Sequence, residues 1–459
     1  MKVVNRTLLT MAAVALLSAC SVFDDDDDDV DLPPAPQVTK ARVVHASPDA
    51  PKVDVLAGGT TAVNDLDYAN ATPYFNASVG NVSATVQGVT PGGNVTVIGP
   101  ANLTLNADRN YTLIATGNVA NITLDVIDAS TAAVPSGSTQ VTVFHGAPNA
   151  PGVDVYVTAP TADLASAAAL GNFSFRQKLG PVTVNNGDYR IRVTPTGNRS
   201  TVVFDSGTIS LSGGDLLLVA LQNILATEID NTVSPINLLL SDGVNPSSII
   251  RDANTPAALR VVHNSPDAPA VDVVVNDNFA APLVNALAYP NFTPYATVPP
   301  DSYNVKVAAD ADNSIVAINA DLDLAANSVS TVAAVGPLAS IEPLVQSDRI
   351  RRIATEAQVR LTHGSPTAGN VDIYVTPMGT DINTVTANFS NVPFKADTGY
   401  VSLATGRYDI TITATGSKTA AIGPLTVTLE NGGIYSAIAR DAAGGGLPLG
   451  VILLDDFAP

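Results

Sequence analysis

The sequence predicts an all-β protein built from four immunoglobulin-like β-sandwich domains in tandem. Two observations predict this fold: a histidine-containing motif recurs four times, and apolar and polar residues alternate in many short runs. The composition agrees, since 46% of the 459 residues are apolar, Trp is absent, and 33 Gly and 32 Pro supply turns. Such a composition favours short strands over helices, and the length suits several domains rather than one.

The chain begins with the features of an exported lipoprotein. Lys2 and Arg6 precede a mostly apolar run at residues 8–17, which is shorter than a membrane-spanning helix needs. The sequence LSAC at residues 17–20 resembles the lipobox of bacterial lipoproteins, in which the cysteine is lipidated and becomes the new N-terminus. We therefore expect residues 1–19 to be a lipoprotein signal peptide and Cys20 to carry the lipid, including palmitate. An ordinary secretory signal with a chance cysteine is the alternative.

The residues after Cys20 predict a tether and a location in the cell envelope. Cys20 is the only cysteine, so the domains are held by their cores rather than by disulfides. Ser21 stands where lipoproteins retained in the inner membrane tend to carry Asp, which favours the outer membrane, on its periplasmic or surface face. An acidic run at residues 24–29 and a Pro-rich stretch at 32–36 predict an extended spacer over residues 20–40.

The charge and the small number of reactive side chains exclude several classes of function. A net charge of -20 argues against nucleic-acid binding, because neutralising phosphates requires a basic face. Four His and one Cys are few for metal or nucleophile chemistry across four domains. We expect no cofactor, and the predicted partners are the membrane, through the lipid, and an envelope protein or polysaccharide.

Each repeat opens with a motif in which an aspartate follows a histidine by nine residues. Residues 42–55 read RVVHASPDAPKVDV, and related copies occupy residues 142–155, 260–273 and 360–373. The motif contains every histidine of the chain, and its conspicuous pairs are His45 and Asp54, His145 and Asp154, His263 and Asp272, and His363 and Asp372. This repetition predicts domains at residues 41–140, 141–258, 259–358 and 359–459.

A second set of similarities orders the repeats as A-B-A-B. Repeats 1 and 3 share a tyrosine followed by Thr-Pro-Tyr, at residues 68–74 and 289–295, whereas repeats 2 and 4 share Asn-Phe-Ser at 172–174 and 388–390. The order is that of a duplicated two-domain protein. Whether each B repeat packs on its A partner is left open by the sequence.

Alternating residues predict half-buried strands within each repeat. Tyr189, Ile191 and Val193 alternate with arginines, and residues 303–307 and 408–412 follow the same period of two. A turn residue precedes each tyrosine, an opening similar to the tyrosine corner of immunoglobulin-like sandwiches. Residues 162–170 are the notable helix-tolerant stretch, and we expect an inserted loop or one short helix there.

The repeated motif resembles a known family. Its pattern Val-x-His-x-Ser-Pro-Asp-Ala-Pro-x-Val-Asp-Val is similar to that of the domain of unknown function 4397 family of bacterial envelope and secreted proteins. The resemblance covers nearly the whole mature chain in tandem copies, and repeat 4 departs from it at Thr367 and Gly369. It implies a fold and a location but no agreed activity.

The histidine and aspartate of each motif have three interpretations. A hairpin would place them opposite each other on one face, where the imidazole donates to the carboxylate or to a loop carbonyl and pins the Pro-rich turn; this structural role is the favoured one. Metal binding has at most three ligands per site, counting Asp49 or Asp267, which is few for zinc or calcium. A His-Asp pair could serve Ser47, Ser265 or Ser365 as nucleophile, but repeat 2 has Ala147 there. We therefore expect neither catalytic nor metal-ligating residues.

The aromatic residues of the A repeats suggest a binding site. Tyr74 and Tyr295 follow prolines, and exposed rings at these positions could stack on sugars through their apolar faces. The competing interpretation is that they cap the core. The sequence as a whole predicts a non-catalytic, lipid-anchored envelope protein whose modules act as a spacer or as a binding or adhesion surface. An envelope hydrolase or metal-dependent enzyme that uses the His-Asp sites is the alternative.

Overall fold

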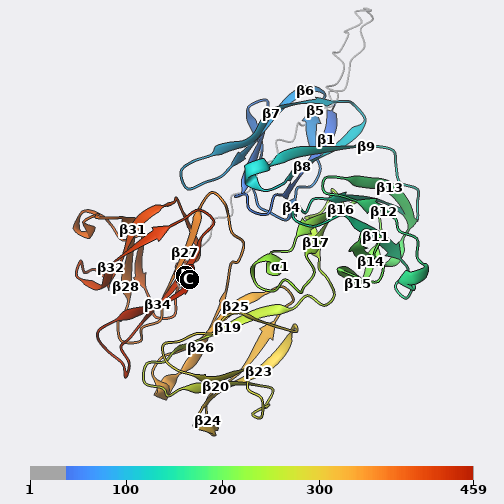
Figure 1. The fold of residues 1–459 in the computed structure, drawn as a ribbon. Helices are drawn as coiled ribbons and strands as arrows, with labels where there is room; N and C mark the ends of the chain where they lie inside the picture. The colour runs from blue at the N-terminus through green and yellow to red at the C-terminus, as the bar shows by residue number, and fades with distance from the viewer. Residues whose placement is uncertain (1–37, 458–459) are drawn as a thin grey trace, which may run out of the picture. The chain divides into compact units, whose positions relative to one another are not determined.

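The computed structural model describes residues 38–457, which fall within one compact unit. These residues form four successive β-sandwiches, each made of two sheets whose strands come from one repeat (Figure 1). The predicted all-β tandem architecture is confirmed. The predicted signal peptide, Cys20 and the acidic tether lie outside the described residues.

Repeat 1 pairs a sheet of order β4-β1-β8-β9, in which β5 also pairs with β1, with a sheet of order β3-β2-β6-β7. Its elements are β1 (Val38–Ala46), β2 (Val53–Ala57), β3 (Thr60–Leu66), β4 (Asn70–Ala71), β5 (Phe75–Ser78), β6 (Gly80–Gly88), β7 (Val95–Leu105), β8 (Arg109–Thr116), the 3-10 turn η1 (Val119–Asn121) and β9 (Thr123–Ser130).

Repeat 2 has sheets of order β13-β10-β16-β17-β18 and β12-β11-β14-β15. Its elements are β10 (Ser138–His145), β11 (Val153–Thr158), η2 (Leu164–Ser166), β12 (Gly171–Phe173), β13 (Lys178–Asn185), β14 (Gly187–Pro195), β15 (Phe204–Leu211), β16 (Gly214–Gln222), α1 (Ile224–Glu228), β17 (Ile236–Ser241) and β18 (Ser248–Ile250).

Repeat 3 has sheets of order β22-β19-β25-β26 and β21-β20-β23-β24. Its elements are β19 (Ala257–Asn264), β20 (Val271–Val275), β21 (Val284–Leu287), β22 (Ala296–Val298), β23 (Asp301–Ala309), β24 (Asp312–Leu324), β25 (Val329–Val335), η3 (Leu338–Ser340) and β26 (Glu342–Ser347).

Repeat 4 repeats this plan with sheets of order β30-β27-β33-β34 and β29-β28-β31-β32. Its elements are β27 (Ala357–His363), β28 (Val371–Pro377), η4 (Ile382–Thr384), β29 (Phe389–Val392), β30 (Val401–Leu403), β31 (Gly406–Ala414), β32 (Ala420–Leu429), β33 (Ile434–Arg440) and β34 (Gly450–Asp455).

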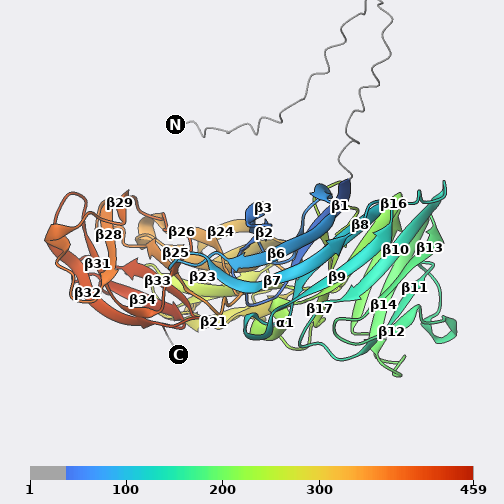
Figure 2. The same cartoon turned by 90° about the horizontal axis from the view of Figure 1, so that it is seen from above.

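The first strand of every repeat pairs in parallel with a strand near the end of that repeat. The parallel pairs are β1 with β8, β10 with β16, β19 with β25 and β27 with β33, and Figure 2 shows β1, β8 and β9 side by side. The second strand lies in the other sheet. The predicted hairpin between the histidine strand and the aspartate strand is therefore wrong. Period two indicates which face a strand buries but not which strand it pairs with, and here the Pro-rich connection crosses between the sheets.

The predicted tyrosine corner is confirmed in three repeats. The hydroxyl of each tyrosine donates to the backbone carbonyl four residues upstream: Tyr189 to Asn185 at 2.7 Å, Tyr303 to Pro299 at 2.7 Å and Tyr408 to Ala404 at 3.0 Å. This bond fixes the turn that precedes β14, β23 and β31.

Short helices and strand starts differ slightly from the sequence expectation. The stretch 162–170 contains the single 3-10 turn η2, where the Asp163 side chain accepts a bond from the Ala165 amide at 3.0 Å. The one-turn helix α1 was not predicted, because five residues are too few to show a period of 3.6. β1 and β10 begin three residues before the expected boundaries at 41 and 141, and β19 and β27 begin two before those at 259 and 359.

Each A repeat also shares a buried core with the B repeat that follows it. Val44 and Ile114 of repeat 1 pack with Leu217 and Leu239 of repeat 2, and Val262 of repeat 3 packs in the same way with residues of repeat 4. The strand carrying the motif is therefore buried on both faces, toward its own sandwich and toward the neighbouring repeat. No helix within residues 38–457 has the length and hydrophobicity that crossing a bilayer requires.

Candidate functional site

The four motif histidines hold the loop that follows the first strand of each repeat. Each imidazole is buried, and its Nε2 atom lies within hydrogen-bond distance of the backbone carbonyl six residues further on. The distances are 2.9 Å from His45 to Pro51, 3.1 Å from His145 to Pro151, 2.9 Å from His263 to Pro269 and 2.6 Å from His363 to Gly369. Of the two predicted acceptors, carboxylate or loop carbonyl, the structure contains the carbonyl. Because the acceptor is backbone, glycine in place of proline at 369 does not disturb it.

The second ring nitrogen is also engaged in three repeats. Nδ1 of His45, His263 and His363 accepts the backbone amide of the serine two residues later, at 3.3, 3.3 and 3.4 Å. These contacts require the neutral imidazole with its proton on Nε2. In repeat 2 the serine is replaced by Ala147, and the buried Nδ1 of His145 has no hydrogen-bond partner among the described residues.

Burial keeps these imidazoles neutral. It lowers the pKa of His45 to about 4, and it lowers the pKa values of His145, His263 and His363 as well. The charge of Arg351, whose guanidinium donates to the Ala50 carbonyl at 2.8 Å, also lowers the pKa of His45. A proton added at Nδ1 would also face an amide donor. Burial, the charge of Arg351 and the Ser47 amide therefore each disfavour the charged form of His45.

An aromatic ring meets each imidazole edge to face. The ring centroids are 6.1 Å apart for His45 and Tyr68, 6.4 Å for His145 and Phe175, 5.9 Å for His263 and Tyr289, and 6.1 Å for His363 and Phe394. The tyrosines belong to the A repeats, and each donates its hydroxyl to the neighbouring B repeat: Tyr68 to the Gln222 carbonyl and Tyr289 to the Asp441 carbonyl. This contact explains why A repeats carry tyrosine where B repeats carry phenylalanine.

The aspartates of the motif do not contact the histidines. In repeats 1, 3 and 4 the carboxylate accepts the amide of a residue with positive φ in a bulge of the adjacent strand. These bonds join Asp54 to Asp65, Asp272 to Ala286 and Asp372 to Asn391, at 2.9, 2.8 and 2.8 Å. In repeat 2, Asp154 accepts the Asn172 side chain at 3.0 Å instead. The predicted facing His-Asp couple is thus wrong, and the two residues stabilise different parts of the sandwich.

The residues considered as metal ligands do not come together in the described part of the chain. Asp49 and Asp267, the additional ligands considered, each accept a backbone amide at 2.7 Å, from Val119 and Leu338 respectively. Within residues 38–457, no group of three His, Cys, Asp or Glu side chains is arranged to hold an ion.

Arginine side chains stack on the rings of the two tyrosines that were predicted to stack on a ligand. The guanidinium carbon of Arg42 lies 4.6 Å from the ring centroid of Tyr74, and that of Arg260 lies 4.6 Å from Tyr295. The Tyr295 hydroxyl donates to Asp348 at 2.7 Å, and the backbone amide of Tyr74 donates to the Gly243 carbonyl of repeat 2 at 2.8 Å. The ligand-stacking prediction is therefore wrong, because these rings line the contact between repeats.

Three buried arginines were not singled out by the sequence interpretation. Arg42, Arg260 and Arg360 occupy the same motif position, and each buried side chain contacts a residue of the partner repeat. Arg42 donates to the Ser241 hydroxyl at 3.2 Å, Arg260 pairs with Asp455 at 2.6 Å, and Arg360 pairs with Asp348. The sequence feature that could have identified these arginines is a positive charge that recurs in an otherwise apolar strand.

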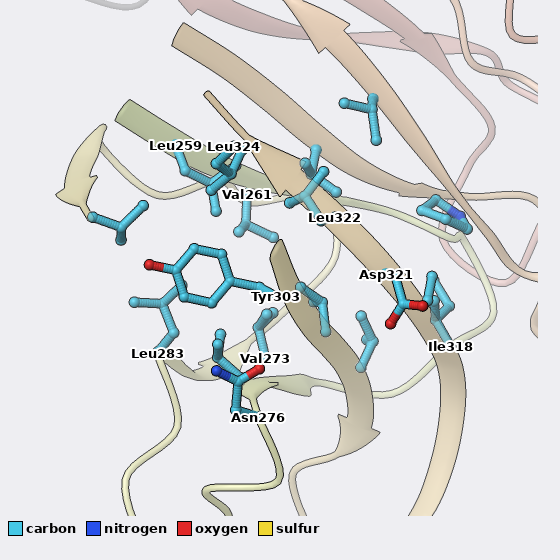
Figure 3. A pocket seen from close by; sticks show the side chains of 18 of the residues that line it. Leu259, Val261, Val273, Asn276, Leu283, Tyr303, Ile318, Asp321, Leu322 and Leu324 are labelled. Atoms are coloured by element: carbon cyan, nitrogen blue, oxygen red, sulfur yellow. The ribbon is translucent and has the colours of Figure 1, made fainter. Parts of the chain in front are cut away.

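Repeat 3 contains a large apolar cavity between its two sheets. Its volume is about 410 Å³, whereas the equivalent spaces of repeats 2 and 4 measure about 20 Å³ each. Figure 3 shows Leu259 and Val261 of one sheet facing Val273 and Tyr303 of the other sheet across this space. The cavity reaches the surface, because exposed residues such as Leu283 and Val345 are among those that line it.

Comparisons with known proteins identify a family but no activity. A family model described as Domain of unknown function (DUF4397) matches residues 39–156, 257–374 and 376–459. No curated protein matches the chain. Among solved structures, the chain is similar to a product complex of SpuA, a multi-modular glycogen-degrading pneumococcal virulence factor, with 9% identity and a TM-score of 0.15. That similarity covers 61% of this chain and 37% of the other, and at this TM-score it implies nothing about function.

Proposed function

Because the family model covers more than half of its residues, the chain belongs to the DUF4397 family, and from this premise we propose a non-catalytic, lipid-anchored protein of the cell envelope. Its tandem sandwiches act as a spacer and present a binding surface to an envelope protein or polysaccharide. The lipid on Cys20 holds the chain at the outer membrane, and the acidic segment at residues 24–29 keeps the modules away from an anionic surface.

The observation that carries the non-catalytic proposal is the state of the four histidines. A general base or a metal ligand needs a ring nitrogen that faces its substrate or ion. Here every Nε2 is directed at a loop carbonyl, and every ring is at most 3% exposed. The enzyme alternative also needs the aspartate beside the histidine, and the two lie in opposite sheets. This geometry supports a binding and spacing role over hydrolysis.

The shared cores between A and B repeats support the spacer role. Apolar residues of both repeats close each contact, and buried arginines bridge it. Two modules joined in this way behave as one stiff element rather than as independent domains on a flexible linker. Repeated modules also multiply weak contacts into useful avidity.

The anchor is tested by Cys20→Ser. We expect this variant to lose metabolic labelling by a palmitate analogue and to move from the membrane fraction to the soluble fraction. Ser21→Asp serves as the matched control: it should keep the label and shift the protein from the outer to the inner membrane. A Cys20→Ser protein that stays membrane-bound would contradict the proposed lipid anchor.

The structural role of the motif is tested by His263→Ala. Removing the buried donor leaves the Pro269 carbonyl without a partner, so we expect the free energy of unfolding to fall by roughly 1–3 kcal/mol. His145→Ala is the internal comparison and should cost less, because its Nδ1 has no partner to lose within residues 38–457. Thermal unfolding measures both variants. If a chelator lowers the melting temperature of the wild type, the metal alternative is correct instead.

A further inference from the structure

We infer that the cavity of repeat 3 is a binding site for a small uncharged apolar molecule, such as a hydrocarbon chain or ring with a neutral end group. The inference goes beyond the proposed spacer role and is independent of the lipid anchor. It stands on the volume of the cavity, the origin of that volume in particular side chains, and the charges around its opening.

The volume is that of a ligand site rather than of a packing defect. An apolar cavity of roughly 150 Å³ already accommodates benzene, and small-molecule pockets begin at about 300 Å³. The repeat 3 cavity, at about 410 Å³, exceeds both. Interiors of folded domains are close-packed, and the corresponding spaces in repeats 2 and 4 obey this rule.

Four residues that line the cavity of repeat 3 are smaller than their equivalents in repeat 4. The strand registers align Val273, Val305, Val307 and Ala320 of repeat 3 with Ile373, Ile410, Ile412 and Leu425 of repeat 4. All four repeat 3 residues line the cavity. The three Ile-to-Val differences and the Leu-to-Ala difference remove carbon atoms that fill the core of repeat 4.

A fifth difference lies at the end of the same core. The residue paired with the motif strand is Ser330 in repeat 3, where repeats 1, 2 and 4 carry Tyr111, Leu216 and Tyr435. In repeats 1 and 4 the tyrosine hydroxyl accepts the backbone amide five residues upstream, at 2.9 and 3.0 Å, so its ring spans that end of the sandwich. Repeat 3 lacks this ring. These five differences lie in one repeat and are distributed over its two facing sheets.

The surroundings select an uncharged ligand. The cavity wall is almost entirely aliphatic, and its Tyr303 hydroxyl already donates to the Pro299 carbonyl. Asp321 is the one charged residue of the lining, and the nearest lysine on the same sheet, Lys306, is paired with Asp277. The lining residues therefore supply no cation to hold a carboxylate or phosphate head group at the opening, whereas Asn276 and Asn278 can meet a neutral polar end.

The test is a fluorescence titration of the full-length chain carrying Cys20→Ser with the neutral probe N-phenyl-1-naphthylamine. We expect saturable binding of one probe per chain with a micromolar Kd. Ala320→Leu, which copies repeat 4, should weaken binding by about tenfold or more without lowering the melting temperature. Ala326→Leu is the matched control: it makes the same change at an exposed position of repeat 3 outside the lining, and it should leave binding unchanged.

Competition separates the ligand classes, and a second variant protects the test against misfolding. Neutral dodecanol should displace the probe and anionic dodecanoate should not; equal displacement by both overturns the charge argument. The triple variant Val273→Ile, Val305→Ile and Ala320→Leu should abolish binding. Absence of saturable binding to the parent chain, or binding unaffected by both filling variants, overturns the site. Xenon applied to crystals of the parent chain gives a check without mutation, since it should occupy the cavity of repeat 3.

Discussion

Replacing Arg360 by methionine is expected to lower the free energy of unfolding by about 3–5 kcal/mol, because it removes the arginine that pairs with a buried carboxylate. The side chain of Asp348 is fully buried, and Arg360 is the cation paired with it. The other side chains that donate hydrogen bonds to the Asp348 carboxylate are the hydroxyls of Tyr295 and Thr331, which are neutral. Methionine retains most of the aliphatic volume of the arginine, so the loss reports on the charge rather than on a new void.

The double variant Arg360→Met with Asp348→Asn should recover part of that stability, since a neutral amide costs less to bury than an unpaired carboxylate. Arg109→Met is the matched control, because Arg109 and Asp128 form an ion pair that is substantially exposed. Its loss should cost no more than about 1 kcal/mol. Urea unfolding of the Cys20→Ser chain measures all three. Equal losses for Arg360→Met and Arg109→Met would show that the buried pair does not stabilise the fold.

The recurring arginine also shows what a strand sequence leaves undetermined. Arg42, Arg260 and Arg360 alternate with apolar residues that face their own sandwich, so period two places the arginines on the outer face. On an isolated domain that face meets water, and the arginine needs no partner. Here it meets another repeat. The presence of that repeat is a property of the assembled chain and cannot be obtained from the alternation of one strand.

The same limit explains the error over the histidine and the aspartate. Their constant spacing predicted a shared role, but spacing does not specify which sheet each strand joins. His45 lies in the sheet of β1 and Asp54 in the sheet of β2. By contrast, the tyrosine corner could be predicted, because Tyr189, Tyr303 and Tyr408 each bond to a carbonyl only four residues away. Local contacts follow from local sequence, and contacts between sheets do not.

The cavity of repeat 3 could be predicted from the sequence only in part. No single residue of repeat 3 signals it, since Val305 and Ala320 are ordinary members of apolar strands. It appears only when equivalent positions are compared between repeats, and those equivalences depend on the strand registers, including the bulges in β24 and β32 pairing. A repeated protein thus contains its own reference for core packing once the register is known.

The stability of the chain is expected to fall as the pH is lowered from about 6.5 toward 5, in the range where histidine titrates in an unfolded chain. Burial lowers the pKa of all four histidines in the folded state, to about 4 for His45. Between these values the unfolded chain binds more protons than the folded chain, so acid favours unfolding. The contribution of His45 is fully present above its unfolded pKa and is lost as the pH falls toward its folded one.

The magnitude for His45 alone is about 2 kcal/mol at pH 5, from an unfolded pKa near 6.5 and a folded pKa of about 4. Carboxyl groups such as those of Asp205 and Asp456 have lowered pKa values, so they act below this range. Burial raises the pKa values of Asp215 and Glu356, which act with the opposite sign. A comparison with a variant that lacks only the His45 titration removes these other groups from the result.

His45→Gln provides that comparison, because glutamine does not titrate. At pH 7 the wild type should be the more stable, since its ring packs against Tyr68 and holds the Pro51 carbonyl. As the pH is lowered, the wild type pays the cost of keeping His45 neutral and the variant does not, so their unfolding free energies should converge by about 2 kcal/mol at pH 5. Parallel curves between pH 7 and pH 5 would mean that His45 titrates in the fold as it does in the unfolded chain, so that the ring is charged at pH 5. A charged ring could not accept the Ser47 amide, and the arrangement of the motif loop would then have to differ from the one described.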